Sequence, residues 1–260
     1  MIFDSHFHLL TMYEKKMDLT LPEHFMGLEC GTVPHDAEER IKLVGNNSDI
    51  YLSIGAGPWC TGKGKKVESI ISSLSQDILK YGADAIGECG FDNHWKDYGK
   101  MNEQLELFIR QKELSDSLNV PLIIHSREAD DVLIENIKYI DERTIMHCFS
   151  SSKEIMYKLL DRGAYISFAG NVTYKQNYMI KEAAKECPLS RILYETDSPY
   201  LTPVPKRGEL NKMENTEYTL SFIANEKKID REIIKENAIK NFLTLMKNRK
   251  SIVKRDTTSL

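Results

Sequence analysis

Short apolar segments alternate with amphipathic ones along nearly the whole chain, and this alternation is the strongest constraint on the fold. Each apolar segment has the length and the residue types of a buried strand. The predicted strands are Met1–His8, Met26–Gly31, Ile50–Gly55, Asp84–Cys89, Val120–Ser126, Arg143–Phe149, Ala164–Ala169 and Ile192–Asp197. Eight strands of this kind, with helical patterns between most of them, indicate parallel pairing, because parallel neighbours need a crossover connection.

The helical patterns support this interpretation. Val67, Ile70, Leu74 and Ile78 recur at helix spacing, and residues 105–118, 154–160 and 179–185 give further helices. A long helical region from about residue 216 to 246 has a break near 228–230. We therefore predict an α/β fold, a single-domain (β/α)8 TIM-type barrel over residues 1–248 of the 260. A doubly wound open sheet is the alternative.

Two segments depart from the regular pattern. The connection Leu9–Phe25 contains Pro22 and several polar residues, so its helix is predicted to be short or missing, and this loop can shape a lid or a wall. Residues 249–260 are basic and lack apolar periodicity. We expect them to form a flexible tail, with polyanion binding as the alternative.

Charge and composition limit the partners. The net charge of -4 and pI near 6.0 give no global basic field, so tight nonspecific binding to long nucleic acid is not indicated, although a local basic patch remains open. Five cysteines without a Cys-x-x-Cys pair fit reduced thiols. Asp4 and two histidines interrupt any N-terminal signal, and no apolar run approaches a membrane span of about 18 residues. We expect a cytoplasmic protein without membrane contact.

The first predicted strand carries a possible metal-binding pair. His6 and His8 lie two residues apart, so on a strand their side chains point to the same face and can share a metal ion. Two surface or packing histidines are the alternative for an isolated pair. Active sites of barrels of this type collect at the carboxyl ends of the strands.

Other strands also end in polar residues. Glu88 ends the fourth strand, His125 the fifth, His147 the sixth and Asp197 the eighth. Each alone fits a structural role, such as a core histidine, an ion-pair partner or a turn cap. Together they gather four histidines and two carboxylates at one end of the barrel, where burial without compensation is costly. This ligand set suits Zn, Mn, Fe, Ni or Co, and Glu88 can bridge two ions.

Several motifs carry a family resemblance. They are DSHFHL, IGECGFDNHW, PLIIHSREA, MHCFSSS, YETDSPYLTPVP followed by KRG, and ENAIKNFLTL. With them the sequence resembles the TatD family of metal-dependent hydrolases, a branch of the amidohydrolase-like barrels. The resemblance implies a TIM-type barrel with one or two divalent metal ions (Mg, Mn, Zn, Ni, Fe or Co) that hydrolyses phosphodiester bonds in DNA. Some relatives are described as 3′ to 5′ exonucleases, and others as deacylases acting on aminoacyl-tRNA.

The resemblance also implies residue roles. The implied metal ligands are His6, His8, Glu88, His125, His147 and Asp197. The first three resemble one metal site with Asp197 near it, and Glu88 with the two later histidines resembles a second. Asp92 matches an aspartate with a supporting or structural role. Arg127, Lys206 and Arg207 are predicted to hold an anionic substrate group, although each also fits a solvated surface charge.

The sequence departs from the family on the expected substrate side. Many members carry a histidine before the proline that follows the third strand, where this chain has Gly57. The segment Arg207–Met213 lacks the usual proline. Trp59 and Trp95 lie in loops at the expected open end, where they either stack on a base or pack. Cys148 follows a ligand, and strand alternation predicts that it points away from the metals.

The leading hypothesis is hydrolysis of DNA at its ends by metal-bound hydroxide, with a preference for single-stranded ends. Asp197 would act as general base and Glu88 would hold the ions. A deacylase or amidohydrolase acting on an ester or amide, such as aminoacyl-tRNA, is the second hypothesis. The third is a metal-binding subunit of a larger assembly. A monomer is favoured.

Overall fold

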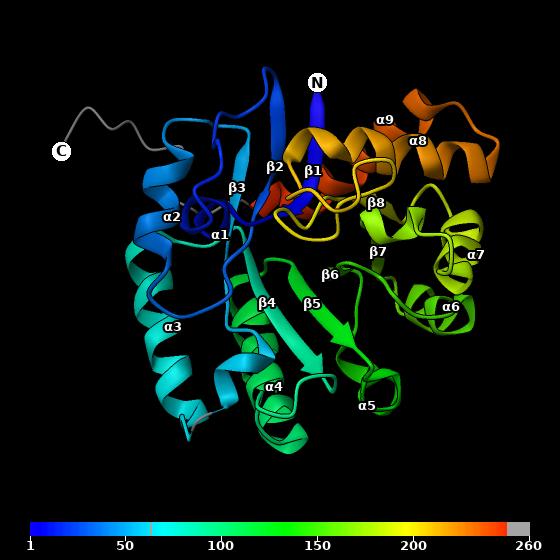
Figure 1. The fold of residues 1–260 in the computed structure, drawn as a ribbon. Coiled ribbons are helices and arrows are strands. Elements are labelled where there is room, and N and C mark those ends of the chain that lie inside the picture. Colours follow the sequence, from blue (N-terminus) through cyan, green and yellow to red (C-terminus); the bar gives the residue numbers. More distant parts are fainter. Residues whose placement is uncertain (63, 249–260) are drawn as a thin grey trace.

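The computed structural model describes residues 1–62 and 64–248 and contains the predicted barrel. Its strands are β1 (Ile2–Phe7), β2 (Phe25–Glu29), β3 (Ile50–Ile54), β4 (Ala85–Asp92), β5 (Leu122–Arg127), β6 (Thr144–Met146), β7 (Tyr165–Phe168) and β8 (Ile192–Tyr194). All neighbours pair in parallel, in the order β1-β2-β3-β4-β5-β6-β7-β8 (Figure 1). The basic segment 249–260 lies outside the described residues, and its predicted role stays a prediction.

The two ends of the sheet meet and nearly close the barrel. The backbone N–H of Asp197 donates to the carbonyl of His6 at 3.0 Å, and the N–H of His8 donates to the carbonyl of Ser198 at 3.0 Å. A parallel bridge between Phe7 and Ser198 completes this contact. The open-sheet alternative is therefore wrong, and the closure brings the segment after β8 against the histidines of β1.

Helices follow the strands on the outside of the barrel. They are α1 (Leu9–Glu14), α2 (Ala37–Val44), α3 (Val67–Tyr81), α4 (Met101–Leu118), α5 (Asp130–Glu135), α6 (Lys153–Asp161), α7 (Tyr178–Glu186), α8 (Thr216–Lys227) and α9 (Arg231–Leu245). The short α1 confirms the prediction for the first connection. The predicted break between α8 and α9 is present, with Lys228 in the left-handed region and Asp230 capping α9 through the N–H of Glu232.

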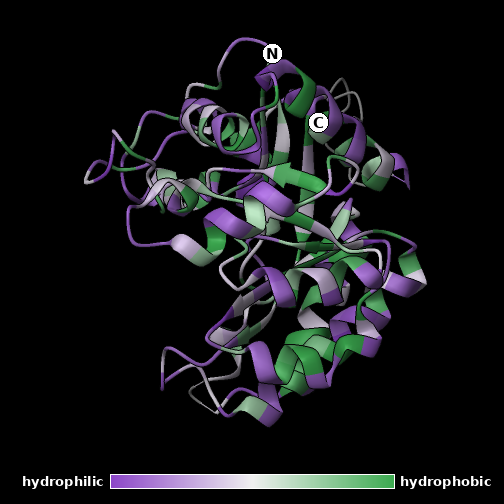
Figure 2. Cartoon of the chain, turned by 90° about the vertical axis from the view of Figure 1, so that its right-hand side faces the viewer, coloured by the Kyte–Doolittle hydropathy of each residue, from purple (hydrophilic) through white to green (hydrophobic). Residues whose placement is uncertain are grey.

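Apolar side chains of the strands and of the inner helix faces form the core. Phe242 of α9 packs edge-on against Phe3 of β1 and Tyr51 of β3, with ring centroids 5.2 Å apart in both pairs. Figure 2 shows hydrophobic colour in the central strands and alternating colours along the helices, as amphipathic packing requires. Within the described residues, no helix is both long and apolar enough to cross a membrane.

Candidate metal centre

The six predicted metal ligands meet at the carboxyl ends of the strands. They are His6 in β1, His8 directly after it, Glu88 in β4, His125 in β5, His147 directly after β6 and Asp197 three residues after β8. Four of them are at least 95% buried, and the other two are partly exposed. Residues separated by up to 191 positions thus share one site, because the barrel ends its strands at one rim.

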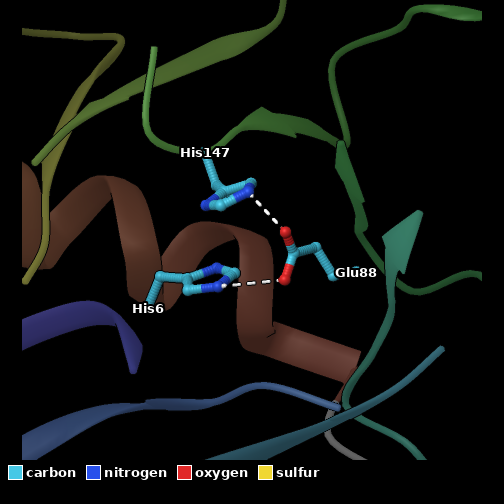
Figure 3. A group of neighbouring side chains, drawn as sticks. All are labelled: His6, Glu88 and His147. Carbon is cyan, nitrogen blue, oxygen red and sulfur yellow. Dashed lines mark ion pairs between the residues drawn. The ribbon is translucent and has the colours of Figure 1, made fainter. Parts of the chain in front are cut away.

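Glu88 lies at the centre of this site. Its Oε1 is 2.8 Å from Nε2 of His147 and 3.1 Å from Nδ1 of His125. Its Oε2 is 3.7 Å from Nε2 of His6 and 3.8 Å from Nε2 of His8. Figure 3 shows the carboxylate between His6 and His147, one oxygen directed to each. The two oxygens therefore face two different pairs of imidazoles, the arrangement of a carboxylate shared by two metal ions.

The β1 pair and Asp197 form the first group of donors. Nε2 of His6 and Nε2 of His8 lie 3.1 Å apart. Oδ1 of Asp197 is 3.2 Å from Nε2 of His8 and 3.8 Å from Nε2 of His6. Ligand atoms bound about 2.0–2.2 Å from one ion lie roughly 3–3.5 Å from one another. The donor set and its spacing fit a transition-metal ion.

The electrostatics of the buried ligands also fit a cation. Burial disfavours a charged imidazole at His8, but the hydrogen bond and charge of Asp197 outweigh it and raise the pKa of His8 to about 9. Burial alone would raise the pKa of Glu88, yet the charge of His147 and the surrounding imidazole hydrogen bonds hold it well below its usual value. The carboxylates therefore attract positive charge, which protons or metal ions can supply.

The second nitrogen of three imidazoles is held by a partner. His125 donates from Nε2 to Oδ2 of Asp92 at 3.1 Å, which agrees with the supporting role predicted for Asp92. His8 donates from Nδ1 to the carbonyl of Cys30 at 3.0 Å. His147 donates from Nδ1 to Oε1 of Glu195 at 3.3 Å. These bonds fix the rings so that the opposite nitrogens face the site, where they contact Glu88 or Asp197.

Glu195 and Cys30 are site residues for which the sequence predicted no role. Glu195 is fully buried and also accepts a hydrogen bond from the N–H of Cys148 at 2.7 Å. Its position two residues before Asp197 in the predicted strand Ile192–Asp197 was the signal that could have identified it, although the strand in the structure ends at Tyr194. Cys30 places its Sγ 3.3 Å from Nδ1 of His6. It follows β2, and its contact with the site depends on the tertiary structure.

Local backbone geometry positions the two carboxylates. Gly87 has φ of +131°, and a Cβ there would lie 2.6 Å from the carbonyl oxygen of Ile123, so only glycine lets β4 approach β5 this closely before Glu88. After β8, the Asn211 amide donates to the carbonyls of Thr196 at 2.9 Å and Tyr200 at 2.7 Å. Asn211 thereby holds the loop that presents Asp197, although this segment lacks the family proline.

A pocket of about 780 Å³ opens over the ligands. Its aromatic wall residues are Trp59, Trp95, Tyr98, Tyr174 and Tyr200. Cys148 also lines it, so the prediction that Cys148 points away from the site is wrong. The strand β6 ends at Met146, and Cys148 has φ of +46°, so strand alternation no longer sets its direction.

The three predicted substrate-binding cations lie in different places. Arg127 lines the pocket, with its guanidinium carbon 5.9 Å from the ring centroid of Trp95. Arg207 packs over the ring of Tyr174 at 4.3 Å and contacts the pocket through that side chain. Lys206 does not line the pocket, and its Nζ lies 3.8 Å from Glu209. The geometry therefore keeps Arg127 as the foremost candidate for an anionic group.

A barrel with six candidate metal ligands at one rim, under an open pocket, is an arrangement that suits metal-dependent hydrolysis. A family model described as TatD related DNase matches residues 3–247, so the chain belongs to the TatD family.

Relatives of this chain carry consistent names. The metal-dependent hydrolase YabD of Bacillus subtilis is 39% identical over 263 residues, covering 93% of this chain and 99% of that protein. YcfH of Escherichia coli, also named a metal-dependent hydrolase, is 36% identical over 173 residues, covering 65% of this chain and 63% of YcfH, less than two thirds of its length. The human 3′-5′ RNA nuclease TATDN2 is 38% identical over 146 residues, covering 54% of this chain and 19% of TATDN2.

Solved structures show the same fold. The TatD homologue YJJV of Escherichia coli has a TM-score of 0.83 at 22% identity, covering 94% of this chain and 97% of that one. A TatD family hydrolase of Entamoeba histolytica has a TM-score of 0.80 at 18% identity, with the same coverage. At these identities the likeness establishes the barrel and nothing finer.

Proposed function

We propose that this chain is a divalent-metal-dependent nuclease that removes nucleotides from the 3′ ends of single-stranded DNA. The observation that carries the proposal is Glu88, whose two oxygens face two groups of imidazoles on the floor of the pocket. Two metal ions bridged by a carboxylate suit in-line displacement at phosphorus. The name of the human relative TATDN2, a 3′-5′ RNA nuclease, supports nuclease chemistry in the family.

The protein's own groups divide the work between them. Bound divalent ions supply Lewis-acid polarisation of the scissile bond and lower the pKa of water. The side chain of Asp197 is 14% exposed and lines the pocket, so its carboxylate can accept a proton from an attacking water. The side chain of Glu88 is only 4% exposed, so it is enclosed and serves as a ligand. Arg127 at the pocket wall can hold a phosphate of the substrate.

The pocket walls favour an unpaired strand over a duplex. Five aromatic side chains line the pocket, and unstacked bases bind to such rings. The net charge of -4 gives the chain no overall positive field to attract a duplex backbone. We therefore expect the enzyme to act at ends, where a base can leave the stack and enter the pocket.

A deacylase or amidohydrolase is the second candidate function. Among residues 1–62 and 64–248, Arg127 is the only lysine or arginine that lines the pocket, and this is a low positive charge for a phosphodiester substrate. The same ligands can polarise an ester or amide carbonyl. An aminoacyl ester would place its apolar side chain against the aromatic walls.

The test uses purified protein with Mg, Mn, Zn or Co. Substrates are single-stranded DNA labelled at either end, duplex DNA, single-stranded RNA and an aminoacyl ester panel, and His125→Ala is the control for contaminating nuclease. We expect stepwise loss of nucleotides from the 3′ end of single-stranded DNA, and a strongly reduced rate for the variant. Cleavage of RNA alone would change the substrate, and cleavage of esters alone would establish the deacylase. Metal binding without any hydrolysis would instead support a binding subunit.

A further inference from the structure

Trp59 lines the pocket and is held by contacts on several sides. It lies in a 3-10 turn, Pro58–Thr61, that begins four residues after the end of β3, and its indole N–H donates to the carbonyl of Thr32 at 3.0 Å. The same carbonyl accepts the backbone N–H of Gly57 at 3.0 Å. The indole is therefore anchored at its polar edge, and its ring is directed to the ligands.

The indole contacts a predicted metal ligand. Its ring meets the ring of His125 edge-on, with centroids 5.7 Å apart and an interplanar angle of 81°. Tyr98 packs on Trp59 as well, at 5.8 Å. His125 is otherwise held by Asp92 at Nε2 and faces Glu88 with Nδ1. A hydrogen bond to Asp92 fixes one edge of the imidazole, and the indole restricts its rotation about that bond.

Gly57 is explained by the same contact. Its backbone has φ of -66° and ψ of 167°, an extended conformation open to every residue, so backbone freedom does not require glycine here. A Cβ at this position would lie 2.1 Å from Cζ2 and 2.3 Å from Cε2 of the Trp59 indole. Space for the indole therefore requires glycine at 57, and any larger side chain displaces the ring.

We propose that Gly57 and Trp59 form a matched pair that positions His125 for metal binding. Trp59 is a positioning residue: it holds the imidazole in the orientation in which Nδ1 faces Glu88 and, with Glu88 and His147, would hold an ion. The inference rests on the metal centre of the proposed function but does not depend on which bond is hydrolysed. Residues that orient metal ligands from behind typically change metal affinity by about 10–100-fold.

The experiment measures metal binding by calorimetric titration of metal-free protein with Mn²⁺ or Zn²⁺. His125→Ala identifies the ion that depends on His125. We expect Trp59→Ala to lower the affinity for that ion by about 10-fold or more and to leave the affinity for the other ion unchanged. Trp59→Phe, which keeps an edge-on ring, should regain most of the affinity. Trp95→Ala is the matched control, because Trp95 lines the same pocket but has no ring contact with His125 among the described residues.

A double-mutant cycle tests the pairing. Gly57→Ala should lower the affinity for the same ion, because the new methyl group displaces the indole. In the Trp59→Ala background the same change should have almost no effect, so the two losses are not additive. Additive losses would show that the two positions act independently and would overturn the pair.

Other outcomes separate this inference from the proposed function. If His125→Ala loses one ion but Trp59→Ala binds that ion with wild-type affinity, the positioning role of Trp59 is overturned and the proposed function is not. Equal binding curves for wild type and His125→Ala would overturn both, since no ion would then depend on His125. Thermal unfolding is measured for each variant, and should Trp59→Ala not fold, Gly57→Ala and Trp59→Phe carry the same test.

Discussion

Two buried polar clusters lie on neighbouring parts of this barrel, and they differ in how their charges are balanced. In the first, the guanidinium of Arg40 on α2 is 1% exposed and donates to Glu29 of β2 at 2.5 Å, to Asp36 at 2.9 Å and to the carbonyl of Ser53 at 2.9 Å. We call these four residues the arginine cluster. Its one cation comes from the chain and is shared by the two carboxylates. Backbone N–H groups hold the remaining oxygens: Leu9 donates to Glu29 and Thr32 to Asp36, each at 3.2 Å, so the polar groups find partners within the chain.

The metal centre is built differently. Its carboxylates are surrounded by four imidazoles, whose charge depends on bound protons, and the cluster lines a pocket open to solvent. A cation can therefore replace protons there, which the enclosed arginine cluster does not allow. The difference suggests a rule: a buried cluster whose polar groups find their partners within the chain serves stability, and one that can exchange its protons for an outside cation serves chemistry.

Metal removal should produce the largest contrast between the two clusters. We expect a chelator to reduce hydrolysis to background, because the metal centre loses the charge that polarises the substrate. The metal-free chain should keep its circular dichroism spectrum but unfold at a lower temperature, since bound metal stabilises the native state. Activity that persists after complete metal removal, verified by elemental analysis, would contradict this expectation.

Substitution of Asp197 should separate chemistry from metal binding. We expect Asp197→Asn to lose about 10²–10⁴-fold in kcat at saturating metal, because the amide cannot accept the proton. His125→Ala should instead lose metal first and regain part of its activity as metal is raised. The measurement is kcat against metal concentration, with occupancy determined separately. Full rescue of Asp197→Asn by metal would make the carboxylate a ligand only.

Substitution in the arginine cluster should affect stability. We expect Arg40→Met to lower the free energy of unfolding by about 3–5 kcal/mol, because Glu29 would remain buried without its partner. Lys42→Met, on the same helix, is the control: Lys42 is 70% exposed and pairs with Glu38 at the surface, so its loss should change stability by about 0.5 kcal/mol or less. Denaturant titrations measure both. Metal affinity that falls in Arg40→Met would show that the clusters are not independent.

The smallest predicted effect compares two fully buried carboxylates. Glu195 holds His147, and Glu29 holds Arg40; each has no exposed surface. We expect Glu195→Gln to weaken metal binding by about 10-fold, because the amide orients the imidazole without its charge. Glu29→Gln should reduce stability and leave metal affinity unchanged. Metal affinity is measured by calorimetric titration, and stability by denaturant unfolding, for both variants. Loss of metal affinity in Glu29→Gln, with loss of stability alone in Glu195→Gln, would refute the rule.

The sequence alone predicted the barrel and the six residues that converge at its rim. A strand repeats its side-chain directions every two residues, and parallel strands end at one rim, so His6, His8 and Glu88 could be placed together from local patterns. Asp197 reaches the same rim because β8 ends there, although it lies three residues beyond that strand and has φ of +55°. The same reasoning failed at Cys148, because β6 ends two residues earlier and the alternation ends with it.

Only the tertiary structure decided what surrounds the ligands. The contact of Trp59 with His125, the hydrogen bond of Glu195 to His147 and the enclosure of Arg40 join residues from 11 to 66 positions apart. These contacts depend on how loops and helices pack against neighbouring strands, and periodicity within one segment carries no information about that packing. Gly57 is the clearest case, because its backbone fits any residue and only the indole packed against it requires glycine.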